Sequence, residues 1–212
     1  SNPMPYGYVG DVSDKIKQSK KNNGVLTVNE VADLKTDGSW GGSMEHIETQ
    51  TLSGAVSTLS FDTLKENKYS VHFITIENYV PDTDNRHLGL RFKVSGSADS
   101  GTNYQYSMER VTASTSSQLY SAGDSKIWLA YNCGTGTGES LNGIIYVYNA
   151  GSSSDTFITH NFFMIDKDTN QSQNFGTALN DVNQVVNGLQ FMASGDNLLS
   201  GTFKLFGIKD NT

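Results

Sequence analysis

The chain has 212 residues, of which only 17% are charged, and it carries a formal net charge of −7. The acidic balance argues against a nucleic-acid partner, which normally faces a basic surface. The absence of an apolar run of about 18 residues argues against membrane insertion, and the single cysteine, Cys133, excludes an intrachain disulfide and a zinc site built on paired cysteines.

Residues 1–43 are predicted to form an arm with one short helix. Glycines, asparagines and four lysines leave residues 1–24 with little apolar surface to bury. Thr27 and Glu30 then match a capping box, in which the two side chains satisfy the first free amides of a helix. A helix of this length is not stable alone, so we expect it to dock on the rest of the chain or on a neighbouring subunit.

From residue 44 onward the apolar pattern has the two-residue period of half-buried antiparallel strands. The clearest run is Leu88 to Ser95, in which every second side chain is apolar. The predicted strands are residues 44–52, 56–61, 69–80, 88–95, 104–108, 127–131, 144–148, 157–165, 185–192 and 202–208.

The connections between these strands are rich in glycine, serine and asparagine, which are turn-forming residues. The Ser/Thr-rich stretch 112–117 is predicted to be a loop. Many short strands joined by such turns indicate an all-β fold, and we predict an antiparallel two-sheet β-sandwich of jelly-roll type over residues 44–212. No repeat of fixed period is present, which argues against a propeller or solenoid.

The nearest approach to a metal site is the loop that contains Asp166, Asp168 and Asn170. Oxygen ligands at alternate positions can wrap a calcium ion. The loop lacks the glycine and the bidentate glutamate of an EF-hand, since Gln171 and Thr177 occupy those positions. A plain turn is the favoured interpretation and calcium binding is the open alternative; no other cofactor is predicted.

Tyr146 and Tyr148 are the candidate binding residues. They alternate with Ile145 and Val147 in a predicted strand, so the two tyrosines share one face. If the aliphatic pair points inward, the tyrosines form an exposed stacking surface for a sugar or a protein. Packing in the core or between subunits is the alternative role.

No set of residues in the sequence has the pattern of a catalytic site. The four histidines lack a metal-ligand spacing, and the alternating glycines 134, 136 and 138 do not form a phosphate-binding motif. No base can be identified beside Cys133, and no pair of carboxylates can be placed at a glycosidase separation from sequence. We therefore predict a protein that is not an enzyme.

Three sequence stretches stand out together along the chain. The first combines a glycine, aliphatic residues and a glutamate with a later Gly-x-Trp, the second leads into a predicted strand, and the third is the closing strand. They are residues 23–34 with 38–40 and 47–51, residues 64–69 with 81–84, and residues 200–208.

In this order, the three stretches resemble virion structural proteins of tailed phages, especially marine ones. The first is similar to a short N-terminal segment common in phage tail and fibre proteins, with Leu26 in place of the usual aromatic residue. The resemblance implies a tail-fibre, appendage or head-decoration subunit that is assembled in the host cytoplasm and exposed on the virion. It carries over no catalytic residue.

This resemblance implies particular partners. We expect the protein to assemble with itself and with other virion proteins through residues 1–43, and its sandwich to contact a glycan or protein of the host surface. The alternative function is a carbohydrate-binding or adhesin module, calcium-assisted if the loop at Asp166 binds the ion. A sandwich-fold glycosidase or lyase is the third hypothesis.

Overall fold

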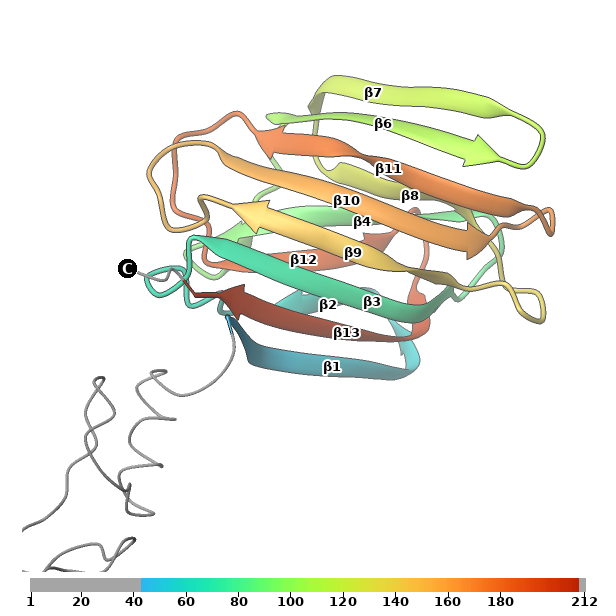
Figure 1. Ribbon diagram of the computed structural model, residues 1–212, viewed down its shortest axis with the longest axis horizontal. Coiled ribbons are helices and arrows are strands. Elements are labelled where there is room, and N and C mark those ends of the chain that lie inside the picture. The colour runs from blue at the N-terminus through green and yellow to red at the C-terminus, as the bar shows by residue number, and fades with distance from the viewer. Residues whose placement is uncertain (1–42, 210–212) are drawn as a thin grey trace, which may run out of the picture. The chain divides into compact units, whose positions relative to one another are not determined.

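The computed structural model describes residues 43–209, and every regular element in this range is a β-strand. The strands form two antiparallel sheets that lie face to face; Figure 1 looks onto the larger sheet, with the smaller one behind it. The all-β fold with two antiparallel sheets, predicted from the sequence, is confirmed. The predicted arm and helix lie outside the described residues, so they and the proposed domain boundary stay predictions.

The larger sheet has eight strands, and β1 and β7 form its two edges. All of its neighbouring strands run antiparallel. In spatial order the strands are β1 (Met44–Val56), β13 (Leu198–Ile208), β3 (Val71–Pro81), β9 (Leu141–Tyr148), β10 (Thr156–Ile165), β11 (Gln171–Asn180), β6 (Tyr104–Thr112) and β7 (Ser116–Asp124).

The smaller sheet lies against the inner face of the larger one. Its central strand β4 pairs with β12, β5 and β8, and β2 pairs with β12. The bounds are β2 (Thr58–Phe61), β12 (Gly188–Ala193), β4 (Arg86–Val94), β5 (Ser97–Ala98) and β8 (Ile127–Cys133).

The core lies between the two sheets and is made of the inward-facing residue of each alternating pair. Phe191 of the smaller sheet meets Phe203 of the larger one with ring centroids 5.1 Å apart, and both side chains are fully buried. Burying one such side chain contributes about 1.5–3 kcal/mol. Every second side chain of a strand points into the core, so the side chains between these point outward. This alternation positions the site described below.

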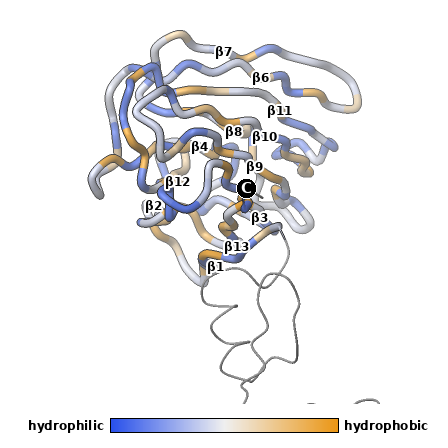
Figure 2. Tube along the Cα trace, turned by 60° about the vertical axis from the view of Figure 1, so that its left-hand side comes forward, coloured by the Kyte–Doolittle hydropathy of each residue, from blue (hydrophilic) through white to orange (hydrophobic). Residues whose placement is uncertain are grey.

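Two long strands were absent from the sequence prediction. β11 places polar Ser172, Asn174 and Asn180 toward the core, so it lacks the apolar alternation that marks a strand. β7 is an edge strand of small and polar residues, and it is drawn largely in pale, intermediate colours in Figure 2. The loop prediction for residues 112–117 is wrong in part, because Ser116 and Ser117 begin β7.

Candidate functional site

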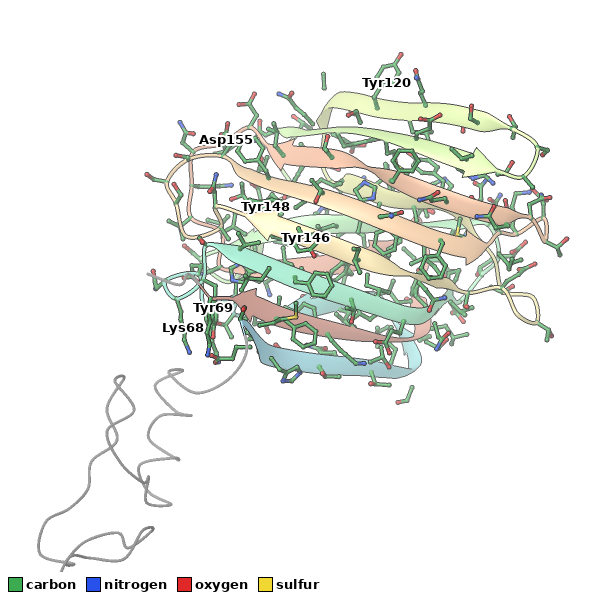
Figure 3. All side chains as sticks on the ribbon, in the orientation of Figure 1. Lys68, Tyr69, Tyr120, Tyr146, Tyr148 and Asp155 are labelled. Carbon is green, nitrogen blue, oxygen red and sulfur yellow. The ribbon has the colours of Figure 1, made fainter. Side chains whose placement is uncertain are left out.

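The outer face of the larger sheet carries the candidate site. Ile145 and Val147 are fully buried, so Tyr146 and Tyr148 of β9 lie on the opposite, outer face. Their rings are 6.3 Å apart and inclined by only 26° (Figure 3). The aliphatic pair therefore points inward, which is the condition given above for a tyrosine pair on the outer face. The binding role of the pair stays a prediction.

The strand registers place one outward-facing residue from each of the eight strands in a single line across the sheet. Each member is directly opposite the next on the neighbouring strand, so the line runs perpendicular to the strands. We call it the central row: His46, Phe206, Phe73, Tyr146, Thr159, Thr177, Ser107 and Tyr120.

One half of the central row is aromatic. The ring centroids of His46 and Phe206 are 5.5 Å apart, those of Phe206 and Phe73 6.1 Å, and those of Phe73 and Tyr146 4.9 Å. Such cross-strand pairs each contribute about 0.2–1 kcal/mol to sheet stability. The result is a continuous aromatic strip from the edge strand β1 to the centre of the sheet.

The other half of the central row is hollow. Thr159, Thr177 and Ser107 have short side chains, and Tyr120 follows them on the edge strand β7 with 78% of its surface exposed (Figure 3). Three overlapping depressions lie along these residues: one of about 520 Å³ beside Tyr120, one of about 540 Å³ beside Tyr146, and one of about 430 Å³ beside Phe175 and Glu109. Thr177 lines all three, and we call the combined depression the hollow.

A second line of outward-facing residues, parallel to the central row, is apolar. It flanks the hollow at Phe157, which is 40% exposed. We call it the apolar row: Met44, Ile208, Val71, Tyr148, Phe157 and Leu179.

The opposite flank of the hollow is polar. The Gln173 side-chain amide donates to the Asn161 side-chain oxygen at 2.9 Å, and both residues line the depression beside Tyr146. Phe175 lies between Asn161 and Glu109, directly opposite each of them on its two neighbouring strands. The hollow therefore combines aromatic walls with hydroxyl and amide groups.

His160 lies on the inward side of β10, below the hollow. It is 4% exposed, and neither ring nitrogen has a hydrogen-bond partner among the described residues. Burial lowers its pKa to about 4, so the ring is neutral at pH 7. His72, by contrast, is bonded through Nε2 to the Leu64 carbonyl oxygen at 2.7 Å.

The loop considered for calcium is closed by its own contacts. The buried Asp166 carboxylate pairs with the Arg110 guanidinium and accepts the backbone N–H groups of Asp168 and Asn170, both at 3.0 Å. The Asp168 carboxylate pairs with Lys167 at 2.7 Å. No group of three or more His, Cys, Asp or Glu side chains in the described part of the chain is arranged to hold a metal. Calcium binding here stays a prediction.

The glycine-rich loop after β8 folds around a carboxylate. Glu139 is buried and accepts the backbone N–H of Gly136 at 2.7 Å. A side chain at Gly134 would meet the same carboxylate at 2.0 Å, so the loop needs glycine there. Cys133 at its start is buried and its pKa is raised to about 12 by burial, which leaves it a thiol at neutral pH.

No protein-family model and no curated protein sequence matches the chain. Among solved structures, the CBM2 module of the evolved Dit of Lactobacillus casei BL23 phage J-1 is 6% identical, with a TM-score of 0.25, over 73% of this chain and 70% of that chain. An exo-inulinase from Aspergillus awamori is 7% identical, with a TM-score of 0.26, over 79% of this chain and 29% of that chain. An alginate lyase from Alteromonas sp. 272 is 10% identical, with a TM-score of 0.23, over 80% of this chain and 92% of that chain. These TM-scores are too low to establish a shared fold.

Sequence reasoning found one member of the central row, Tyr146, and missed the others. Phe73 and Phe206 lie in strands that were predicted, but sequence alone does not say which strands are neighbours in the sheet. Thr177 and Tyr120 lie in β11 and β7, which were not predicted.

Among the described residues no helix is long and apolar enough to cross a bilayer.

Proposed function

We propose that the sandwich of this protein is a carbohydrate-binding module without catalytic activity, displayed on a phage particle. The central row carries the proposal. Tyr146 and Tyr120 stand at the two ends of a hollow that is lined by short hydroxyl side chains. Ligand sites typically combine apolar and aromatic walls with a few polar groups that fix orientation. Sugar rings match this combination, because they present an apolar face of C–H bonds and a rim of hydroxyls.

The position of the carboxylates supports a binding role rather than catalysis. Glycosidases use two carboxyl groups on either side of the scissile bond. Among the described residues that line the hollow, Glu109 is the only carboxylate. Glu77 and Glu45, which do not line the hollow, are paired with Lys204 at 2.7 Å and with Lys68 at 3.0 Å.

The virion setting is supported by the sequence resemblance to phage structural proteins. A glycan-binding face on a particle surface would contact the host cell. Several copies on one particle would raise the overall avidity without any new contact, because each later binding event becomes intramolecular. Weak single sites are therefore compatible with firm attachment of the particle.

Affinity electrophoresis through gels that contain bacterial and algal polysaccharides tests the proposal. We expect at least one polysaccharide to retard the protein. The double substitution Tyr120→Ala/Tyr146→Ala should weaken that retardation by roughly five- to 150-fold, because each lost aromatic contact is worth about 0.5–1.5 kcal/mol. Gln190→Ala, on the outer face of the smaller sheet, is the control and should migrate like the wild type. Equal migration in all gels would refute the proposal.

A second candidate function is packing between subunits, and the apolar row is the observation that favours it. Phe157, Tyr148 and their neighbours form an uninterrupted apolar line on an outer face, where soluble monomers rarely expose contiguous apolar patches. The expected occupant is a second copy of this chain. Light scattering of the wild type and of Phe157→Ser would then show an oligomer that loses mass on substitution; a monomer in both cases would exclude this candidate.

A further inference from the structure

We infer that the ligand is a neutral polysaccharide, one without carboxylate or sulfate groups, and that its chain lies across the strands along the central row. This inference rests on the proposed function and names the class of glycan and its direction. Three observations support it: the charge of the hollow, the chemistry of its polar groups, and its position between the two tyrosines.

The charge of the hollow disfavours an acidic glycan. No lysine or arginine lines it in the part of the chain that the structure describes, and Glu109 adds a negative charge. Sites for carboxylate or sulfate groups normally supply arginine or lysine.

The nearest cations are already engaged. Arg110, next to Glu109 in β6, turns inward to the Asp166 carboxylate, and Lys204 pairs with Glu77. A uronate or sulfate in the hollow would therefore lose its hydration beside a like charge and gain no counter-charge.

The polar groups of the hollow suit neutral hydroxyls. Ser107 and Thr177 lie with their side-chain oxygens 3.5 Å apart on neighbouring strands. The bond from Gln173 to Asn161 uses one donor and one acceptor, which leaves the amide nitrogen of Asn161 and the amide oxygen of Gln173 to a ligand. Hydroxyl and amide groups both donate and accept, as sugar hydroxyls do.

The position of the hollow indicates the direction in which the glycan runs across the sheet. Tyr146 and Tyr120 are separated by four strand spacings, which corresponds to roughly 19 Å. A glycan laid across the strands contacts both tyrosines and the three hydroxyl residues between them. A glycan laid along a strand would reach only one of the two tyrosines.

Within residues 43–209 no strand lies beyond β1 or β7, so in this part of the chain both ends of the central row are open. A long polymer can pass beyond either edge, so the site does not require the end of a chain. We therefore expect the internal segment of a polysaccharide to bind, with affinity rising as an oligosaccharide grows long enough to reach from Tyr146 to Tyr120.

Two cellulose derivatives with the same backbone form a matched probe, since hydroxyethyl cellulose is neutral and carboxymethyl cellulose is anionic. Dextran, glucomannan and β-glucan extend the neutral set, and alginate and polygalacturonate extend the acidic set. We expect retardation by a neutral member and none by the acidic set. Retardation should change less than twofold between roughly 0.01 and 1 M salt, over which the screening length falls from about 30 to 3 Å.

Each outcome has a separate meaning. Binding only to acidic polysaccharides, weakened by salt, would overturn the neutral-glycan inference and leave a carbohydrate-binding function in place. Binding to neither set would overturn the proposed function itself. For a neutral ligand, Tyr120→Ala alone should weaken binding by roughly two- to tenfold. Phe163→Ala should not, since this residue is 58% exposed on the same face but lies outside the central row. The reverse result would refute the cross-strand direction.

Discussion

The two outer faces of the sandwich use their aromatic residues differently. On the smaller sheet, Trp128 lies over Gly89, where a Cβ atom would approach its ring to 3.0 Å, and the Lys126 ammonium covers it at 4.9 Å from the ring centroid. On the larger sheet, Tyr120 and Phe175 stand beside short side chains that leave a hollow. The first aromatic surface is already occupied by the protein itself, whereas the second is open to a ligand. Aromatic content alone therefore does not identify a site; what covers the rings does.

Filling the hollow is expected to have the largest effect. Thr177 is exposed and lines every part of the hollow, so Thr177→Trp should abolish polysaccharide binding, with at least a tenfold loss of retardation in affinity electrophoresis. The matched control is Thr51→Trp, at an exposed threonine in β1 on the same face. If Thr177→Trp still bound polysaccharide, the hollow would not be the binding site, and the larger sheet would no longer differ from the smaller one in offering a surface to a ligand.

On the smaller sheet the same kind of change should act on stability instead. Trp128→Ala uncovers Gly89 and removes the contact with Lys126, so we expect the free energy of unfolding to fall by about 3 kcal/mol. Polysaccharide binding by the folded variant should equal that of the wild type. Denaturant unfolding measures the first quantity and affinity electrophoresis the second; loss of binding with an unchanged midpoint would place a ligand on this face too.

Much of this architecture could be predicted from the sequence, but the site could not. The alternation in Leu88–Ser95 predicts β4, and the order Ile145, Tyr146, Val147, Tyr148 predicts which side of β9 is open, because the period of a strand is two. The central row depends on which strands are neighbours, and β13 lies between β1 and β3 although it is last in the chain. β11 also buries asparagines, so the strand that lines the hollow lacks the apolar alternation by which it could have been predicted.

The interior between the two faces is expected to respond to acid. Because burial lowers the pKa of His160 to about 4, the unfolded chain takes up a proton below about pH 6.5 while the folded protein does not. Stability should therefore be constant above that pH and fall below it, by about 2 kcal/mol at pH 5 from this residue.

Denaturant unfolding at pH 7 and pH 5 measures this loss. His160→Leu should remove most of the pH dependence and leave polysaccharide binding at pH 7 intact, since the side chain is buried on the inward side of β10. A smaller residual slope is expected from His72, whose pKa is also lowered by burial. An unchanged slope in His160→Leu would show that another group causes the acid response.

The smallest effect is expected from calcium. Arg110 and two backbone N–H groups already engage both oxygens of the Asp166 carboxylate, so a calcium ion would have to compete with a buried ion pair for this ligand. We expect the thermal midpoint to be the same in excess calcium and in EDTA, within the error of differential scanning fluorimetry. A thermal midpoint that rises with calcium in the wild type, and no longer rises in Asp168→Asn, would instead show that this loop is a metal site. The loop already holds its own cation, Arg110, just as the ring of Trp128 is already covered by Lys126. No lysine or arginine of the described residues lines the hollow in this way.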